Sequence, residues 1–158
     1  MMLVKTKVGK SPIHGLGVFA DEFIPRGTLI FRFVEPLDKR FNKEEVLSFP
    51  KEIQIYLSKY SWVSTKSGLV CVPFDNNKYI NHSTAPNVIS EYKDGEPEVV
   101  SYAICDINPG EELTEDYAKF EDINIKGHVL NEIVKKYHLV DEADPRLKPL
   151  VNSRKKKK

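Results

Sequence analysis

Three short segments of this 158-residue chain combine residue types that could do chemistry, and the first runs from His14 to Phe19. Gly15 and Gly17 stand on either side of one residue, directly before a strand-like stretch. Glycine has no Cβ, so its backbone can adopt positive φ and can let a ligand approach the main chain closely. The same residues suit a plain tight turn, and the GxGxxG spacing of a dinucleotide-binding helix is absent. The segment therefore predicts either a turn or a loop that contacts a ligand.

The second segment, residues 79–87, places the polar run Asn81, His82, Ser83 after an aromatic-aliphatic pair and ends in Pro-Asn. An asparagine amide both donates and accepts, and main-chain groups at such a turn can pair with the mixed edge of an adenine ring. An Asx-type turn with a surface histidine explains the same residues. A metal-binding role is disfavoured, because the remaining histidines, His14, His128 and His138, have no metal-ligand spacing with His82.

The third segment, residues 108–117, reads as a turn, a short strand and then Tyr117 in an acidic neighbourhood. A hairpin with a solvated acidic edge accounts for it. Glu112 and Asp116 could also form a carboxylate pair for acid-base chemistry, although alternating charges on a strand edge need no such role.

The elements that must position these segments are predicted to be mostly short strands, separated by turn signals such as Asp94-Gly95 and Asn108-Pro109-Gly110. The predicted strands are Val18–Ala20, Thr28–Val34, Trp62–Val63, Leu69–Val72, Val88–Tyr92, Glu98–Ile104 and Glu112–Leu113. We expect the first two to form an opening hairpin across the Pro25–Gly27 turn.

Two regions show helical spacing instead. Apolar residues recur at three and four positions from Lys43 to Tyr60, and Pro50 divides this region into two short helices. Gly127–His138 predicts a final amphipathic helix, after which Pro145 and Pro149 end regular structure. Its apolar stripe is formed by Val129, Leu130, Ile133, Val134 and Tyr137.

Composition limits the classes of protein. A chain with 41% apolar residues and this length can bury one core without disulfide or metal staples. Neither a membrane-spanning run nor a signal-like N-terminal segment is visible, so we expect an intracellular, cytoplasmic protein, or a nuclear one if the source is eukaryotic. Cys71 and Cys105 lie singly in apolar stretches without CxxC spacing, which predicts buried thiols rather than a disulfide or a zinc site.

Charge is unevenly distributed. Residues 154–158 carry five positive charges, which leaves 19 basic against 23 acidic side chains in residues 1–153. The tail is expected to be a solvated, disordered end that binds nucleic acid only weakly, if at all. A nucleic-acid-binding strand platform is disfavoured, because the candidate aromatic residues, Phe74, Tyr79, Tyr92 and Tyr102, have acidic or apolar neighbours.

Taken together and in this order, the three segments resemble the SET-domain protein lysine methyltransferases. The matching stretches are GLGVFA, NHSTAPN and GEELTEDY, and the resemblance covers about residues 5–120. It implies a β-rich fold, mainly β with short helices, in which small curved sheets form a pseudoknot and a C-terminal helix follows. The expected organisation is a SET domain over residues 1–122 with insert helices at about 43–60, a C-terminal helical lid over 123–150 and a disordered basic tail over 151–158.

The resemblance also implies S-adenosylmethionine as cofactor and a lysine-containing protein as substrate, whether histone-like or ribosomal. The absence of metal-ligand spacing and of a long apolar run predicts no metal and no membrane partner. Gly15, Leu16 and Gly17 would line the methionine part of the cofactor, and Asn81 with the main chain of His82 would hold it. Lys78 stands where the family commonly has an arginine that contacts the cofactor. Tyr117 matches the active-site tyrosine, which also contacts the cofactor, and Phe120 is a candidate to stack on the adenine.

Departures from the family pattern leave the lysine channel open to interpretation. No cysteine-rich zinc segment follows Tyr117, so the chain from Phe120 through the last helix is expected to supply the lid. Phe33–Pro36 lacks a tyrosine that the family often has, and Ser90 replaces another, with Tyr92 nearby. The number of methyl groups added stays open, and the alternative is a catalytically silent SET-like module that binds a peptide.

Elementary acid-base chemistry assigns Tyr117 its expected role. A lysine ammonium with a pKa near 10.4 must lose its proton before it can attack a methyl group, at a cost of about 4 to 5 kcal/mol at neutral pH. An apolar channel beside a positive sulfur lowers that cost by desolvation and repulsion. An unperturbed phenol titrates near 10 and is a poor base, so we expect Tyr117 to orient the amine.

Overall fold

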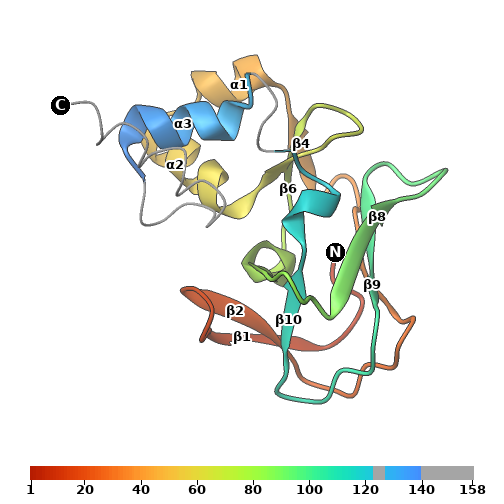
Figure 1. The fold of residues 1–158 in the computed structure, drawn as a ribbon. Coiled ribbons are helices and arrows are strands. Elements are labelled where there is room, and N and C mark those ends of the chain that lie inside the picture. The colour runs from red at the N-terminus through yellow and green to blue at the C-terminus, as the bar shows by residue number, and fades with distance from the viewer. Residues whose placement is uncertain (123–126, 140–158) are drawn as a thin grey trace.

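The structure, a computed structural model, describes residues 1–122 and 127–139, and most of its elements are short strands (Figure 1). In chain order, the first half contains β1 (Thr6–Lys10), β2 (Leu16–Ala20), β3 (Leu29–Arg32), β4 (Lys39–Phe41), α1 (Lys43–Ser48), α2 (Lys51–Tyr60), β5 (Trp62–Val63) and β6 (Val70–Val72). The second half contains the 3₁₀ helix η1 (Asn76–Tyr79), β7 (Asn81–His82), β8 (Val88–Tyr92), β9 (Val99–Ala103), β10 (Glu112–Glu115), the 3₁₀ helix η2 (Tyr117–Lys119) and α3 (Val129–Tyr137). The predicted β-rich class, with few short helices and a C-terminal helix, is confirmed.

Strand β10 occupies the central position of the larger sheet, whose order is β1-β2-β10-β8-β9-β3. It pairs antiparallel with β2 and parallel with both β7 and β8. A smaller sheet has the order β4-β6-β5. Because β2 begins directly after Gly15 and contains Gly17, β7 carries Asn81 and His82, and β10 leads into Tyr117, this pairing brings the three chemical segments together.

The predicted opening hairpin is wrong, since β2 and β3 do not pair. The hairpin joins β1 to β2, with Thr6 opposite Ala20 and Lys10 opposite Leu16. Strand β3 pairs with β9 instead. Two contacts before β3 direct the chain there: Ile24 forms a bridge with Ile107, and the Gly27 N–H donates to the carbonyl of Ala103 in β9. The sequence does not predict strand β1, because TKVGK lacks the alternation of apolar residues typical of a strand. Its lysines are typical of an edge strand.

The other predicted helices and strands are present, whereas the strands β4 and β7 were not predicted. Strands β5 and β8 have the predicted bounds, and α1 and α2 are separated at Pro50. Helix α1 begins with a capping box in which Asn42 and Glu45 each accept the other's backbone N–H, at 2.9 and 2.7 Å. The stop signals Pro145 and Pro149 and the predicted tail at 151–158 lie outside the described residues.

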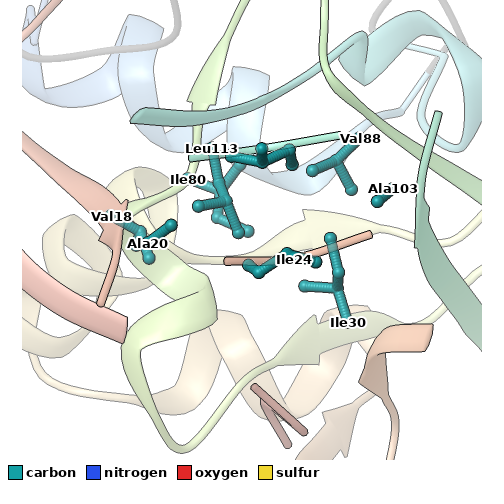
Figure 2. Close-up of a cluster of buried hydrophobic side chains, with 9 residues drawn as sticks. Val18, Ala20, Ile24, Ile30, Ile80, Val88, Ala103 and Leu113 are labelled. Atoms are coloured by element: carbon teal, nitrogen blue, oxygen red, sulfur yellow. The ribbon is translucent and has the colours of Figure 1, made fainter. Parts of the chain in front are cut away.

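One buried cluster lies beneath the strands that carry the motifs (Figure 2). Its members are Val18, Ala20, Ile24, Ile30, Ile80, Val88, Ala103, Ile107 and Leu113. Strands β2, β8, β9 and β10 all contribute to it, and Ile80 stands directly before β7. Burying apolar surface stabilises the fold by about 25 cal/mol per Å². This cluster therefore fixes the relative positions of the strands from which the site is built.

A second cluster holds the helices together at the other end of the molecule, where α1, α2 and α3 gather in Figure 1. It consists of Val46, Leu57, Val70, Val129, Leu130 and Ile133. The predicted apolar stripe of α3 is thus its buried face. None of the described helices has the length and apolarity that crossing a membrane requires.

The two cysteines differ in environment. Cys71 in β6 is fully buried, as predicted, and burial raises the pKa of its thiol. Cys105 is exposed, so the prediction of a second buried thiol is wrong. Strand β9 ends at Ala103, and Cys105 falls in the bend that follows it rather than in the strand.

Candidate functional site

A cavity of about 340 Å³ lies between the strands that carry the motifs and the helices. Its walls come from the glycine loop, the end of α2, η1 and β7, the chain around Tyr117, and the start of α3. The volume falls within the range of small-molecule sites, roughly 300–1,000 Å³.

Most predicted site residues meet in this cavity. Its lining includes Gly15, Leu16, Lys78, Asn81, His82, Tyr117 and Phe120. Gly17 is not among the lining residues. The three segments are separated by up to a hundred residues of chain, and the structure nevertheless brings all of them to one cavity.

Gly17 has a different function, because it leaves room for Glu112. A Cβ at this position would lie 2.3 Å from Glu112 Oε1 and 3.0 Å from Ser11 Cβ. Gly15 needs glycine for another reason, since its φ of 49° lies in the left-handed region. One glycine therefore turns the loop, and the other lets a carboxylate pack behind it.

The Asn81 side chain organises the same loop. Its Nδ2 lies 3.1 Å from the His14 carbonyl, 2.9 Å from the Leu16 carbonyl and 2.8 Å from Glu112 Oε1. Ser11 Oγ donates to the same Glu112 carboxylate at 2.8 and 2.9 Å. Asn81 and Glu112 thus fix the backbone that carries Gly15 and Leu16 into the cavity wall.

Tyr117 is held against the strand that bears His82. In the β7–β10 ladder, Thr114 stands opposite Asn81 and Glu115 opposite His82. The backbone N–H of Tyr117 donates to His82 Nδ1 at 3.3 Å, and the Tyr117 hydroxyl donates to the Ile80 carbonyl. A hydroxyl that donates its proton to a carbonyl presents its oxygen as an acceptor, which suits a positioning role.

Glu112 and Asp116 do not share partners as a catalytic pair would. Glu112 contacts Ser11 and Asn81, whereas Asp116 accepts the N–H of Ala118 and lies 3.9 Å from His82 Nδ1. Their contacts are those of residues that shape a loop and cap a turn.

Phe120 lies at the boundary between cavity and core. It is 6% exposed and meets Trp62 edge-on, with ring centroids 6.0 Å apart. The Tyr117 ring is 5.8 Å away. Phe120 thus supports the cavity wall, and its stacking on adenine stays a prediction.

The helical side of the cavity contains residues that sequence analysis missed. Lys59, Tyr60 and Trp62 come from the end of α2 and from β5, and His128 and Asn131 come from the start of α3. The helical periodicity was visible in the sequence, but which helix ends would face the motifs depends on tertiary packing.

A buried pair connects the start of α3 to the body. Glu121 Oε1 lies 3.2 Å from His128 Nε2 and accepts the Val63 N–H at 3.0 Å. His128 Nδ1 accepts the N–H of Asn131 in the first turn of the helix. The start of α3 is therefore fixed beside the cavity, where the predicted lid would have to lie.

The residues present fit a ligand with both nucleoside and amino-acid character. Two residues of the lining, Trp62 and Asn77, each have a buried polar side-chain atom without a hydrogen-bond partner in the described part of the chain. Trp62 Nε1 is therefore available as a donor to a ligand, and Asn77 Oδ1 as an acceptor. Lys78 adds a cation that can meet a carboxylate. Within residues 1–122 and 127–139 there is no cluster of three or more side chains that could hold a metal ion.

Glu115 is a buried acid that lines the cavity. Burial raises the pKa of its carboxyl from an ordinary 4.5 to about 6, against the opposing effect of hydrogen bonds from Ser90 and Ser101. No pattern in the sequence marks Glu115, because it is one acidic residue among several in the same segment.

This combination of curled sheets, a glycine loop, an Asn-His strand and a tyrosine around one cavity defines a class of β-rich ligand-binding domain. Comparison with known proteins identifies the class. The SET domain family model matches residues 15–118, and the chain belongs to this family. The resemblance found in the sequence is thereby confirmed.

Similar proteins include lysine methyltransferases of larger size. The chain is 33% identical over 118 residues to the H3 lysine-4-specific histone-lysine N-methyltransferase of Schizosaccharomyces pombe, covering 69% of this chain and 12% of that protein. It is 30% identical over 129 residues to the histone-lysine N-methyltransferase set1 of Dictyostelium discoideum, covering 77% and 8%. It spans a third or less of the curated relatives that it matches.

Solved structures agree on the fold. The Chaetomium thermophilum complex ctPRC2, in an autoinhibited conformation bound to S-adenosylmethionine, aligns with a TM-score of 0.58 at 22% identity. The alignment covers 85% of this chain and 17% of that chain. At this identity the match supports the shared fold alone.

Proposed function

We propose that the protein transfers a methyl group from S-adenosylmethionine to the ε-amino group of a lysine in a protein substrate. The observation that carries this proposal is the convergence of Gly15, Asn81, His82 and Tyr117 in one cavity. Family membership and the names of the relatives support it.

The chain's own residues have distinct tasks in this scheme. S-adenosylmethionine supplies a methyl group on a positive sulfur, which a neutral amine can attack with the sulfur as leaving group. The loop around Gly15 and the Lys78 side chain bind the amino-acid end, and unpartnered polar atoms at Asn77 and Trp62 receive polar groups of the nucleoside. The Tyr117 oxygen, fixed by its bond to Ile80, accepts from the amine and orients its lone pair.

The substrate we propose is a lysine-bearing protein, with histone-like and ribosomal proteins as candidates. Relatives named for histone lysines favour the first group. Desolvation of the lysine on entry and repulsion by the positive sulfur lower the cost of deprotonation, and water takes up the proton.

Transfer of label tests the proposal. The full chain is incubated with S-adenosylmethionine labelled in its methyl group and a panel of basic proteins, and mass spectrometry locates the label. We expect labelled lysine with the wild type and a strongly reduced signal with Tyr117→Phe. Absence of label from every protein, despite cofactor binding, would favour the silent peptide-binding module.

Cofactor binding has an independent readout. A ligand that binds only the folded chain raises its melting temperature by mass action, by an amount that grows with ligand concentration. We expect S-adenosylmethionine to do so without added metal. No thermal shift and no calorimetric heat at millimolar cofactor would exclude the cofactor assignment.

A further inference from the structure

Glu115 is one of the residues that line the cavity, and its carboxyl group is buried. It is the last residue of β10, opposite His82 of β7 and Val88 of β8, and only 5% of its surface is exposed. Tyr117 follows two residues later. A buried acid therefore lies close to the groups that the proposed function uses.

The hydrogen-bond partners of this carboxyl are hydroxyl groups. Ser90 Oγ donates to Glu115 Oε1 at 2.7 Å, and Ser90 and Ser101 share a second hydrogen bond of 2.7 Å. Among the described residues, no lysine, arginine or histidine forms an ion pair with Glu115, whereas the buried carboxylate of Glu98 lies 3.5 Å from Arg40. Burying a carboxylate without a cation is costly, so its presence beside a cavity points to a ligand that supplies the positive charge.

The incoming lysine is a ligand with that charge. A carboxylate stabilises the charged form of an amine, so its contribution belongs to the capture of the ammonium rather than to methyl transfer. Discrimination against uncharged side chains follows as well, because an apolar group in the same place would leave the buried carboxylate without a cation.

We propose that Glu115, held by Ser90 and Ser101, is the specificity-determining anion that captures the ammonium group of the target lysine. This inference rests on the proposed function and adds the residue that selects a cationic side chain. The other motif residues contribute no such anion, since Asn81 and Tyr117 are uncharged, Glu112 is engaged by Ser11, and Asp116 is not among the lining residues.

Capture of a cation by an acid competes with protonation of that acid. Since burial raises the pKa of Glu115 to about 6, lysine binding should strengthen as pH rises through that value. The titratable residues on neighbouring elements are His82 on β7, Glu91 and Tyr92 on β8, Tyr102 on β9, and Asp116 and Tyr117 after β10. Imidazoles also change charge in this range, so the source of the pH effect must be assigned with a variant.

The test compares two peptides and two glutamate variants. One peptide is centred on the lysine that the labelling experiment identifies, and the other carries norleucine there, which has the same chain without the amine. Affinities are measured by calorimetry between pH 5 and 8.5 for the wild type, for Glu115→Gln and for Glu111→Gln, whose carboxylate is exposed in the turn before β10. We expect Glu115→Gln to lower the affinity for the lysine peptide by about tenfold at pH 8 and to leave the affinity for the norleucine peptide unchanged. The rise in affinity for the lysine peptide near pH 6 should disappear in this variant. Glu111→Gln should match the wild type.

Ser90→Ala provides a second, independent test. The Ser90 hydroxyl lowers the pKa of Glu115, so its removal should move the rise in affinity to higher pH. If Glu115→Gln leaves the discrimination between the peptides and the pH dependence intact, or if Ser90→Ala leaves the midpoint unchanged, the inference is overturned. Label transfer by the wild type tests the proposed function by itself, so a failure of Glu115 to matter in an active enzyme overturns this inference alone.

Discussion

The two sides of the cavity are built in different ways. On the sheet side, the functional backbone is fixed by hydrogen bonds between neighbouring strands and by the contacts of Asn81 and Glu112 with the glycine loop. On the helical side, the wall depends on how α3 docks against α2 and β5, through the buried cluster that includes Leu57 and Ile133.

This difference separates local from global determinants of function. Residues on the sheet side lie within motifs of six to eight residues, so a change there should alter ligand binding or turnover while the fold persists. Residues on the helical side reach the cavity only through packing, so a change there should lower stability and activity together. Measuring both quantities for each variant tests the distinction.

The largest effect is expected from truncation after Phe120, which removes α3. Four of its apolar side chains, Val129, Leu130, Ile133 and Val134, are at most 4% exposed. Each contributes roughly 1.5–3 kcal/mol of burial, a sum comparable to the whole stability of a domain. We expect the fragment to lose cooperative thermal unfolding, followed by circular dichroism, as well as cofactor affinity.

Two controls accompany the truncation. Removal of residues 154–158 should leave the melting temperature and cofactor affinity unchanged. Ile133→Ala should lower stability by about 2–5 kcal/mol, whereas Lys135→Ala on the exposed face should have little effect. A folded 1–120 fragment with normal affinity and transfer rate would show that α3 is no part of the site.

Tyr117→Phe should produce the largest change on the sheet side. It deletes one oxygen and keeps the ring that packs against Phe120. Turnover should fall by about 10² or more, while cofactor affinity and melting temperature stay close to those of the wild type.

The pH profile of this variant identifies the role of the hydroxyl. If the rising limb persists at lower amplitude, it belongs to the substrate amine and the positioning role holds. Loss of the limb would make Tyr117 the titrating group, and unchanged turnover would remove it from catalysis.

The buried carboxylate of Glu115 should lower the stability of the folded chain at neutral pH. Its pKa in the folded state, about 6, exceeds the ordinary 4.5, so the folded chain holds the proton more tightly than the unfolded chain. Protonated Glu115 therefore stabilises the folded chain. This contribution to the free energy of unfolding is fully present below pH 4.5 and is lost as pH rises through 6, a change of about 2 kcal/mol. Glu115→Gln should therefore gain stability relative to the wild type as pH increases, as measured by urea unfolding from pH 4 to 8. A difference that is constant across this range would contradict the burial of an ionisable acid.

Much of the sheet side could be predicted because its signals are contiguous in the chain. The strands at Val88–Tyr92 and around Glu112 show the period and turn residues of β structure, and the order of the motifs indicates that they converge. The opening hairpin could not be predicted, because the bridge between Ile24 and Ile107 joins residues more than eighty positions apart.

The same limit explains which site residues were missed. The function of Gly17 depends on the approach of Glu112, and the capture role proposed for Glu115 depends on Ser90 and Ser101 on two other strands. His128 lines the cavity only because α3 docks beside β5. Pairings over such distances are fixed by the core and leave no pattern in a local window of sequence.

The smallest of these effects is expected from Asn81→Ala, which tests whether the amide organises the loop or touches the cofactor. Loss of its hydrogen bonds to the loop and to Glu112 should reduce cofactor affinity by about tenfold, the scale of one or two net hydrogen bonds, with a slight fall in stability. Asn108→Ala, in an exposed turn, should leave the affinity unchanged. Ser11→Ala separates the two roles, because Ser11 hydrogen-bonds to both oxygens of the same Glu112 carboxylate and is not among the residues that line the cavity. If Asn81 acts through the loop, Ser11→Ala weakens cofactor binding in the same direction and the double variant loses less than the two single losses combined. If calorimetry shows Ser11→Ala to be silent while Asn81→Ala still weakens binding, the amide contacts the cofactor directly and the network behind Gly17 is only structural.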